Sequence, residues 1–155
     1  MRARPWHVIG LLLLLALAAR AGPTERLAFP LSGGLMVPPT DSPASGSADL
    51  LLDLETASLG GFIVFEHLQG ALTAMQFHGP AAASERGPLL FDLGTTRHVL
   101  IGGLTHVQIR ELQLEQWYVE VHTTAYADGE VRGQIRHASP ALAGATWAAV
   151  KALFR

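Results

Sequence analysis

The clearest signal in this sequence is a regular alternation of apolar and polar residues within residues 117–135. Val119 and Val121 alternate with the polar residues Glu120 and His122, so the pattern repeats every two positions. A period of two sends successive side chains to opposite faces of a β-sheet. The stretch therefore predicts a half-buried strand, and the sequence that follows predicts its return as a β-hairpin.

A turn is predicted where the alternation breaks, at Asp128 and Gly129. Glycine adopts positive φ without steric penalty, and aspartate is common in tight turns. If odd positions face odd positions across the hairpin, the loop is the three-residue Ala127–Gly129 with Gly129 as a G1 bulge. The hairpin then has an inner apolar face of Val119, Val121, Val131 and Ile135, and an outer polar face of Glu120, His122, Arg132 and Gln134.

Shorter alternating or apolar runs predict further strands upstream. They begin with a short strand from Leu27 and continue at residues 48–55, 59–65, 72–78, 89–93 and 98–101, with 80–87 as a surface loop. Thr105 and Gln108 form a capping-box pattern before a helix at 106–114, and an Ala-rich helical pattern follows at 141–155. Together these elements predict an all-β fold. We expect an antiparallel, Greek-key-like β-sandwich or small barrel with one short helix before the last hairpin and a C-terminal helix.

The chain divides into a signal peptide, a leader, a domain and a tail. Residues 1–21 combine an early pair of arginines, an apolar run and an Ala-Arg-Ala end, the pattern of a secretory signal peptide. The alternative is a membrane anchor, but the apolar run is shorter than the roughly 20 residues that span a bilayer. Residues 22–26 are predicted as a polar leader, 27–137 as the folded domain and 138–155 as a helical tail. The mature protein is therefore expected to be secreted or periplasmic, with no transmembrane segment.

Charge and cysteine content narrow the classes of function. The formal net charge is −2, and loss of residues 1–21 removes three of the 11 basic residues and none of the 13 acidic ones. An acidic domain without a basic run argues against nucleic-acid binding. The chain has no Cys, which excludes disulfides, thiol catalysis and Cys-ligated zinc. No G-x-S-x-G elbow is present, and we expect a protein that is not an enzyme.

Two motifs at a fixed spacing connect the hairpin to a known family. The run WYVEVHT at 117–123 is followed by DGEVRGQI at 128–135, while LSGGLMVPP and AMQFHGPA lie upstream. In this combination residues 27–137 resemble the CHRD domain, the module first named from chordin and common in short secreted microbial proteins. The resemblance implies a secreted, non-catalytic domain that is structural or that binds another extracellular protein or polymer. The family positions that we regard as a structural motif are Trp117, Tyr118, Gly129, Glu130, Arg132 and Gly133.

Two of these positions carry opposite charges. Glu130 and Arg132 are two residues apart, so on a strand they share a face and pair with each other or across the ladder. We expect an exposed charge cluster that stabilises the sheet by roughly 0–1 kcal/mol per pair.

Two histidines define a candidate metal site. His78 ends a predicted strand and His122 lies on the polar face of the hairpin, so their imidazoles converge if the two strands are neighbours. CHRD-like sequences often carry H-x-H-G at this strand end, and here Gln76 replaces the first His. An amide oxygen is a poor ligand for Zn or Cu compared with imidazole. We expect no cofactor; the alternative is a Cu or Zn site formed by His78 and His122 with Glu120 or Glu130 as the carboxylate.

Two alternatives compete with metal binding. In the first, both imidazoles hydrogen-bond Thr123, Arg132 or backbone groups and fix the hairpin. In the second, the domain performs superoxide-dismutase-like chemistry, which needs a larger set of His ligands and usually a disulfide. Ring nitrogens of His78 and His122 that face solvent within about 5 Å of each other favour metal binding, whereas a larger separation or orientation into opposite faces excludes it.

Overall fold

The computed structural model describes residues 23–138, which form one antiparallel β-sheet and a single short α-helix. The strands are β1 (Thr24–Ser32), β2 (Ser45–Asp53), β3 (Ser58–Glu66), β4 (Leu72–His78), β5 (Leu89–Asp92), β6 (His98–Ile101), β7 (Tyr118–Thr123) and β8 (Val131–Gln134). A 3₁₀ turn, η1 (Gly33–Leu35), follows β1, and α1 (His106–Gln113) precedes β7. The predicted signal peptide and C-terminal helix lie outside the described residues. Within residues 23–138, no helix has the length and hydropathy needed to cross a membrane.

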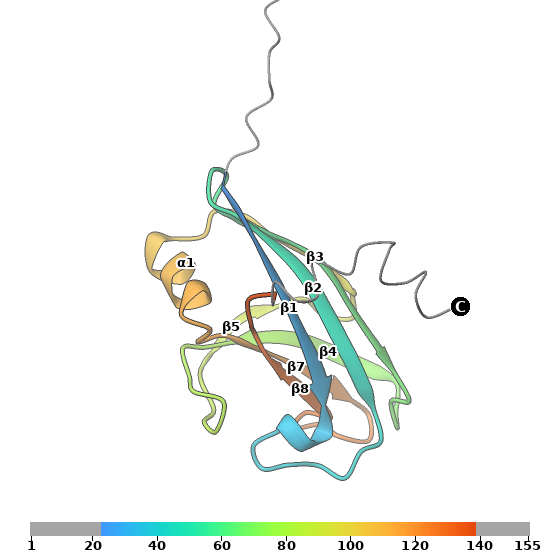
Figure 1. The fold of residues 1–155 in the computed structure, drawn as a ribbon. Coiled ribbons are helices and arrows are strands. Elements are labelled where there is room, and N and C mark those ends of the chain that lie inside the picture. Colours follow the sequence, from blue (N-terminus) through green and yellow to red (C-terminus); the bar gives the residue numbers. More distant parts are fainter. Residues whose placement is uncertain (1–22, 139–155) are drawn as a thin grey trace, which may run out of the picture.

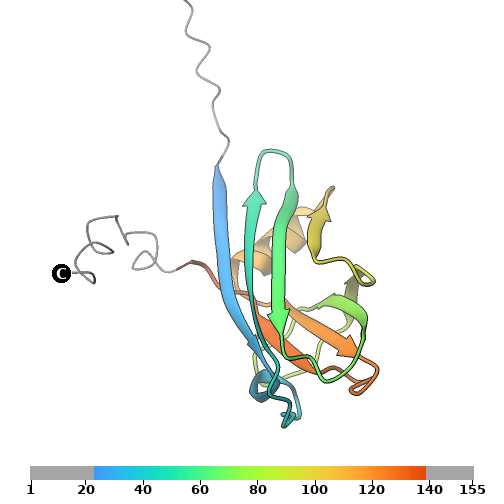
Figure 2. The ribbon, with the colours of Figure 1, turned by 90° about the vertical axis from the view of Figure 1, so that its right-hand side faces the viewer.

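The sheet curls into a half-barrel (Figure 1). Its strand order is β5-β4-β7-β8-β1-β2-β3-β6, and the long strands β1, β2 and β3 run side by side across the shorter ones (Figure 2). β1 pairs with β2 along its whole length, but it meets the other half only where Ser32 faces Arg132 and Leu27 bridges to His137. The sheet bends between β8 and β1 as a result. The predicted antiparallel β fold with one short helix before the last hairpin is confirmed.

The core lies between the two halves of the curled sheet. Leu50 and Leu52 of β2 face inward, as do Met75 and Phe77 of β4. Because side chains alternate along a strand, each strand supplies every second residue to this core. Full burial of a large apolar side chain stabilises a fold by roughly 1.5–3 kcal/mol. Both strands therefore turn one face toward the core.

The last hairpin has the predicted parity but not the predicted loop. Val121 pairs with Val131, so odd positions do face odd positions. β7 nevertheless ends at Thr123, so the prediction of a three-residue loop at Ala127–Gly129 is wrong. The chain reverses earlier, because the backbones of Thr123 and Tyr126 exchange two hydrogen bonds of 3.2 Å. A longer connection then leads into β8.

Helix α1 begins at the predicted capping box. Thr105 Oγ1 accepts from the Gln108 N–H at 3.2 Å, and Gln108 Oε1 accepts from the Thr105 N–H at 2.9 Å. These reciprocal bonds satisfy two backbone donors at the helix start. Beyond the helix, Trp117 is fully buried and donates from Nε1 to Glu111 Oε2 at 2.8 Å. This bond ties the start of β7 to the helix.

Two glycines of the family motif are required by close contacts. At Gly133 an added Cβ would lie 2.6 Å from the Pro30 carbonyl oxygen, so β8 approaches β1 this closely only because residue 133 has no side chain. Gly129 has a φ of +110°, and a Cβ there would lie 2.5 Å from the Met36 side chain. The positive φ predicted for Gly129 is confirmed, although the residue lies in a longer loop.

Gly129→Val is expected to lower the free energy of unfolding by about 2 kcal/mol or more, because it combines backbone strain with the contact to Met36. Gly102→Val is the matched control, since nothing lies within 4 Å of an added Cβ at Gly102. We expect this control to stay within about 0.5 kcal/mol of wild type. Urea denaturation measures both variants, and an unchanged midpoint for Gly129→Val would contradict the assigned backbone.

Candidate metal centre

The polar face of the last hairpin is buried, because residues 79–88, between β4 and β5, fold across it. Glu120 is 0% exposed and Arg132 is 1% exposed, so the prediction of an outer, solvated face is wrong. The physical reason is that backbone carbonyls of this segment accept from polar side chains of the hairpin. Gln134 Nε2, for example, donates to the Ala81 carbonyl oxygen at 3.2 Å. The face keeps its polar character and becomes part of the interior.

Arg132 makes the largest number of these contacts. Its guanidinium donates to the carbonyl oxygens of Glu85 at 2.8 Å and Ala82 at 3.2 Å, and to Gln134 Oε1 at 3.1 Å. It also lies 3.5 Å above the ring centroid of Tyr118, in cation–π geometry. Burial lowers the pKa of Arg132, but a guanidinium remains protonated in proteins. Arg132 thus fastens residues 79–88 to β8.

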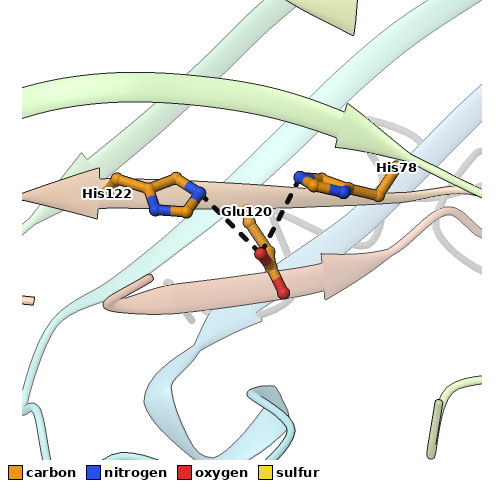
Figure 3. Close-up of side chains that lie close together, drawn as sticks. All are labelled: His78, Glu120 and His122. Atoms are coloured by element: carbon orange, nitrogen blue, oxygen red, sulfur yellow. Dashed lines mark ion pairs between the residues drawn. The ribbon is translucent and has the colours of Figure 1, made fainter. Parts of the chain in front are cut away.

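Three donor side chains meet next to this buried face: His78 from β4, and Glu120 and His122 from β7 (Figure 3). β4 and β7 are antiparallel neighbours with Gln76 opposite Glu120, so His78 lies diagonally across from Glu120. Nε2 of His78 is 3.8 Å and Nε2 of His122 is 3.7 Å from Glu120 Oε2. The three ligand atoms lie within 4.8 Å of one another. The two predicted imidazoles therefore converge, with Glu120 rather than Glu130 as the carboxylate.

The orientation of both imidazoles is set by backbone carbonyls. His122 Nδ1 lies 2.9 Å from the Ala127 oxygen, and His78 Nδ1 lies 3.2 Å from the Gly87 oxygen. A carbonyl can only accept, so each Nδ1 donates its proton, and a neutral ring then has its lone pair on Nε2. Metal-ligating histidines have this arrangement. The backbone bonds of the structural alternative are thus present at Nδ1 of each ring. Nε2 of His78 also lies 3.3 Å from Gln76 Oε1, so Nε2 of His122 is the ring nitrogen without a partner among the described residues.

Glu120 is a buried carboxylate that lacks hydrogen bonds. Among residues 23–138, no donor satisfies either of its oxygens, and Nε2 of His122 is likewise without a partner. Buried polar groups are normally paired, because an unpaired one loses its hydration without compensation. The closest cationic group is Arg86, whose Nη2 lies 3.5 Å from Glu120 Oε2. A negative charge faced by ring-nitrogen lone pairs is the electrostatic setting of a cation site.

His78 is held in the form that binds metals. Burial lowers its pKa below the usual value, although the charge of Glu120 opposes this effect. Its ring also stacks on Tyr118, with centroids 5.2 Å apart and planes inclined by 9°. The imidazole is therefore neutral at pH 7, and a neutral ring is the metal ligand.

Glu130 is a second buried carboxylate, and it is fully satisfied. It accepts from Ser42 Oγ at 2.7 Å, from the Gln69 N–H at 2.8 Å and from Thr123 Oγ1 at 2.6 Å. The expected exposed pair with Arg132 is therefore wrong, because both residues are buried and each has its own partners. Glu130 joins two distant loops to the hairpin and lies outside the group of metal donors.

Gln76 occupies the position of the further imidazole in the H-x-H-G pattern. Its Nε2 donates to Asp92 Oδ2 at 2.9 Å, and this bond lowers the pKa of Asp92. Its Oε1 lies 3.3 Å from Nε2 of His78. The amide is thus beside the donor group without adding a ring nitrogen to it.

Two contributions of residues 79–88 were missed by sequence reasoning: the carbonyl of Gly87 and the guanidinium of Arg86. The interpretation as a surface loop came from composition, which carries no information on where backbone carbonyls point. The only available signal was an arginine in the loop directly after His78. The short distance between Arg86 and the buried carboxylate of Glu120 arises from the tertiary structure, so the local sequence does not predict it.

The donor set fits a transition-metal ion. A tetrahedral Zn²⁺ with bonds of about 2.0–2.2 Å holds its ligand atoms about 3.4 Å apart. The separations of 3.7 and 3.8 Å between Glu120 and the two histidines are close to this value. Two imidazoles and one carboxylate suit Zn²⁺ or Cu²⁺, and a fourth tetrahedral position stays open.

Comparison with known proteins agrees with the motifs in the sequence. No solved structure shows a significant match to the chain. A family model described as CHRD domain matches residues 27–135, which covers most of the described chain. This match supports a non-enzymatic module of extracellular type. The chain belongs to the CHRD domain family.

Proposed function

We propose that this CHRD domain is a non-catalytic extracellular module that binds a divalent transition metal, Zn²⁺ or Cu²⁺, through His78, Glu120 and His122. The observation that carries the proposal is the carboxylate of Glu120, which is buried and lacks a described hydrogen-bond donor while two ring nitrogens face it. A buried charge without partners is unfavourable, and a bound cation removes that penalty.

The chemistry of the donors favours Zn²⁺ or Cu²⁺ over harder ions. Ca²⁺ and Mg²⁺ prefer oxygen ligands and six or more positions. Imidazole nitrogens suit Zn²⁺ and Cu²⁺. The lowered pKa of His78 supports this choice, because no proton has to leave that ring when the metal binds at neutral pH.

The wider role of the module stays a prediction. Export through residues 1–21, and binding of another extracellular protein or polymer or a structural role, rest on the signal-peptide pattern and the family. A metal at this centre would serve either role, because it would link β4 to β7 beside the segment that covers the hairpin.

The purified mature protein is expected to bind one Zn²⁺ or Cu²⁺ ion per chain in isothermal titration calorimetry. His78→Ala and His122→Ala should each weaken binding by about 100-fold or more, because each removes one of three ligands. His98→Ala is the control, since His98 lies on β6, away from the centre. Absence of binding in wild type, or equal binding in the two ligand variants, would overturn the proposal.

Gln76→His is expected to tighten Zn²⁺ binding by about tenfold or more, because residue 76 faces Glu120 across the β4–β7 ladder and adds an imidazole. Thr73→His places a histidine elsewhere on β4 and serves as the control. The same titration measures both variants. If the two variants bind Zn²⁺ equally, residue 76 does not face the metal.

The two buried carboxylates are expected to respond in opposite ways to neutral substitution. Glu120→Gln should raise the free energy of unfolding of the metal-free protein by about 1 kcal/mol, because it removes a buried charge that the long contact to Arg86 compensates only in part. Glu130→Gln should lower it by about 2–3 kcal/mol, because an amide cannot accept all of the bonds from Ser42, Gln69 and Thr123.

Urea denaturation in the presence of a chelator measures both changes. Circular dichroism confirms that each variant is folded before the comparison. Equal destabilisation by the two substitutions would show that Glu120 is as well compensated as Glu130.

A further inference from the structure

Arg86 brings a second cation to the carboxylate of the proposed metal centre. Its Nη2 lies 3.5 Å from Glu120 Oε2, and the same nitrogen donates to the Asp128 carbonyl oxygen at 3.3 Å. Neither contact is a short charge-assisted hydrogen bond of about 2.7–2.9 Å. The side chain is also 48% exposed, so it reaches the buried oxygen from the solvent side.

Arg132, on the same polar face, shows what a fixed guanidinium looks like in this fold. Arg132 is buried, lies on the ring of Tyr118 and donates to several carbonyl groups. Arg86 has a longer bond to the Asp128 carbonyl oxygen, and about half of its side chain is exposed. Of these two cations, Arg86 is therefore the one that can leave its position without breaking the core.

A metal ion and Arg86 would approach the same oxygen. The Arg86 nitrogen lies 3.5 Å from Glu120 Oε2, and a metal–oxygen bond measures about 2.1 Å. The two positive charges would be less than about 6 Å apart, in surroundings where solvent screens them only partly.

We propose that Arg86 is a built-in competitor of the metal, which neutralises Glu120 in the metal-free protein and is displaced when the ion binds. This inference rests on the proposed function, since it concerns the regulation of that centre. The consequence is a metal affinity lower than the three ligands alone would give. Reciprocally, metal occupancy controls whether Arg86 links its segment to Glu120.

A neighbouring groove can accommodate the displaced guanidinium of Arg86. A groove of about 330 Å³ lies beside the centre, and Arg86, Tyr126 and Asp128 are among the residues that line it. Rotation into this groove moves the positive charge away from the metal and toward polar groups of the 124–130 connection. The exchange needs no movement of the β-strands.

Zn²⁺ titration of Arg86→Gln, Arg86→Lys and Arg26→Gln tests the competition. Arg86→Gln should lower the dissociation constant about tenfold, because it removes the competing charge. Arg86→Lys keeps that charge and should bind like wild type. Arg26→Gln removes an equal charge from the remote surface pair with Asp49 and should also bind like wild type. If wild type binds Zn²⁺ and Arg86→Gln binds it equally or more weakly, Arg86 is not a competitor, while the proposed function stands.

Thermal melts of the same proteins separate competition from a purely structural role. Arg86→Gln should melt at a lower temperature than wild type in chelator and should gain more from added Zn²⁺. A structural role alone would lower both melting temperatures and leave the gain from Zn²⁺ unchanged, which would contradict the inference. If none of the proteins binds Zn²⁺, the proposed function and the inference fail together.

Discussion

The site depends on one buried cation, the guanidinium of Arg132. A buried charge is tolerated only when its hydrogen bonds are satisfied. The carbonyls of Ala82 and Glu85 and the ring of Tyr118 supply that compensation, and two of these three partners belong to residues 79–88. The segment therefore closes over the hairpin. This closure turns a polar sheet face into an interior and buries Glu120 beneath backbone that does not bond to it.

The two buried carboxylates of the hairpin region consequently have different roles. Glu130 accepts three hydrogen bonds, two from the loops before β2 and β4 and one from the last residue of β7, so its charge holds the fold together. Glu120 accepts none from the described residues, and its charge works against the fold until a cation compensates it. The same residue type on the same hairpin thus stabilises the fold at position 130 and, under the proposed function, provides binding energy for a cation at position 120.

Local features of the fold could be predicted from the sequence because they arise from short-range geometry. The alternation predicted strands at 48–55 and 72–78, which overlap β2 and β4, and the capping box fixed the start of α1. The hairpin loop was predicted wrongly because Thr123 and Tyr126 close a turn that competes with the Asp-Gly signal.

Only part of the candidate site could be predicted by the same reasoning. Two histidines on predicted strands suggested convergence, but the pairing of β4 with β7 joins segments that are distant in sequence, and no local pattern encodes it. Burial of the polar face depends on carbonyl groups of a loop, and every residue type has a carbonyl. Composition therefore could not identify Gly87 as the group that orients His78.

Residues 79–88 act on the centre in two opposing ways. The Gly87 carbonyl oxygen accepts from Nδ1 of His78, which in the proposed centre directs Nε2 to the metal, whereas the adjacent Arg86 brings a rival charge to Glu120. A metal-bound state needs the first contact and excludes the second. Arg132 holds the backbone at Glu85, and β5 begins just after these residues at Leu89, so the backbone around Arg86 is fixed. The Gly87 contact can therefore be kept while the Arg86 contact is lost only if the Arg86 side chain rotates. Cation exchange at Glu120 is then a side-chain event on a fixed scaffold.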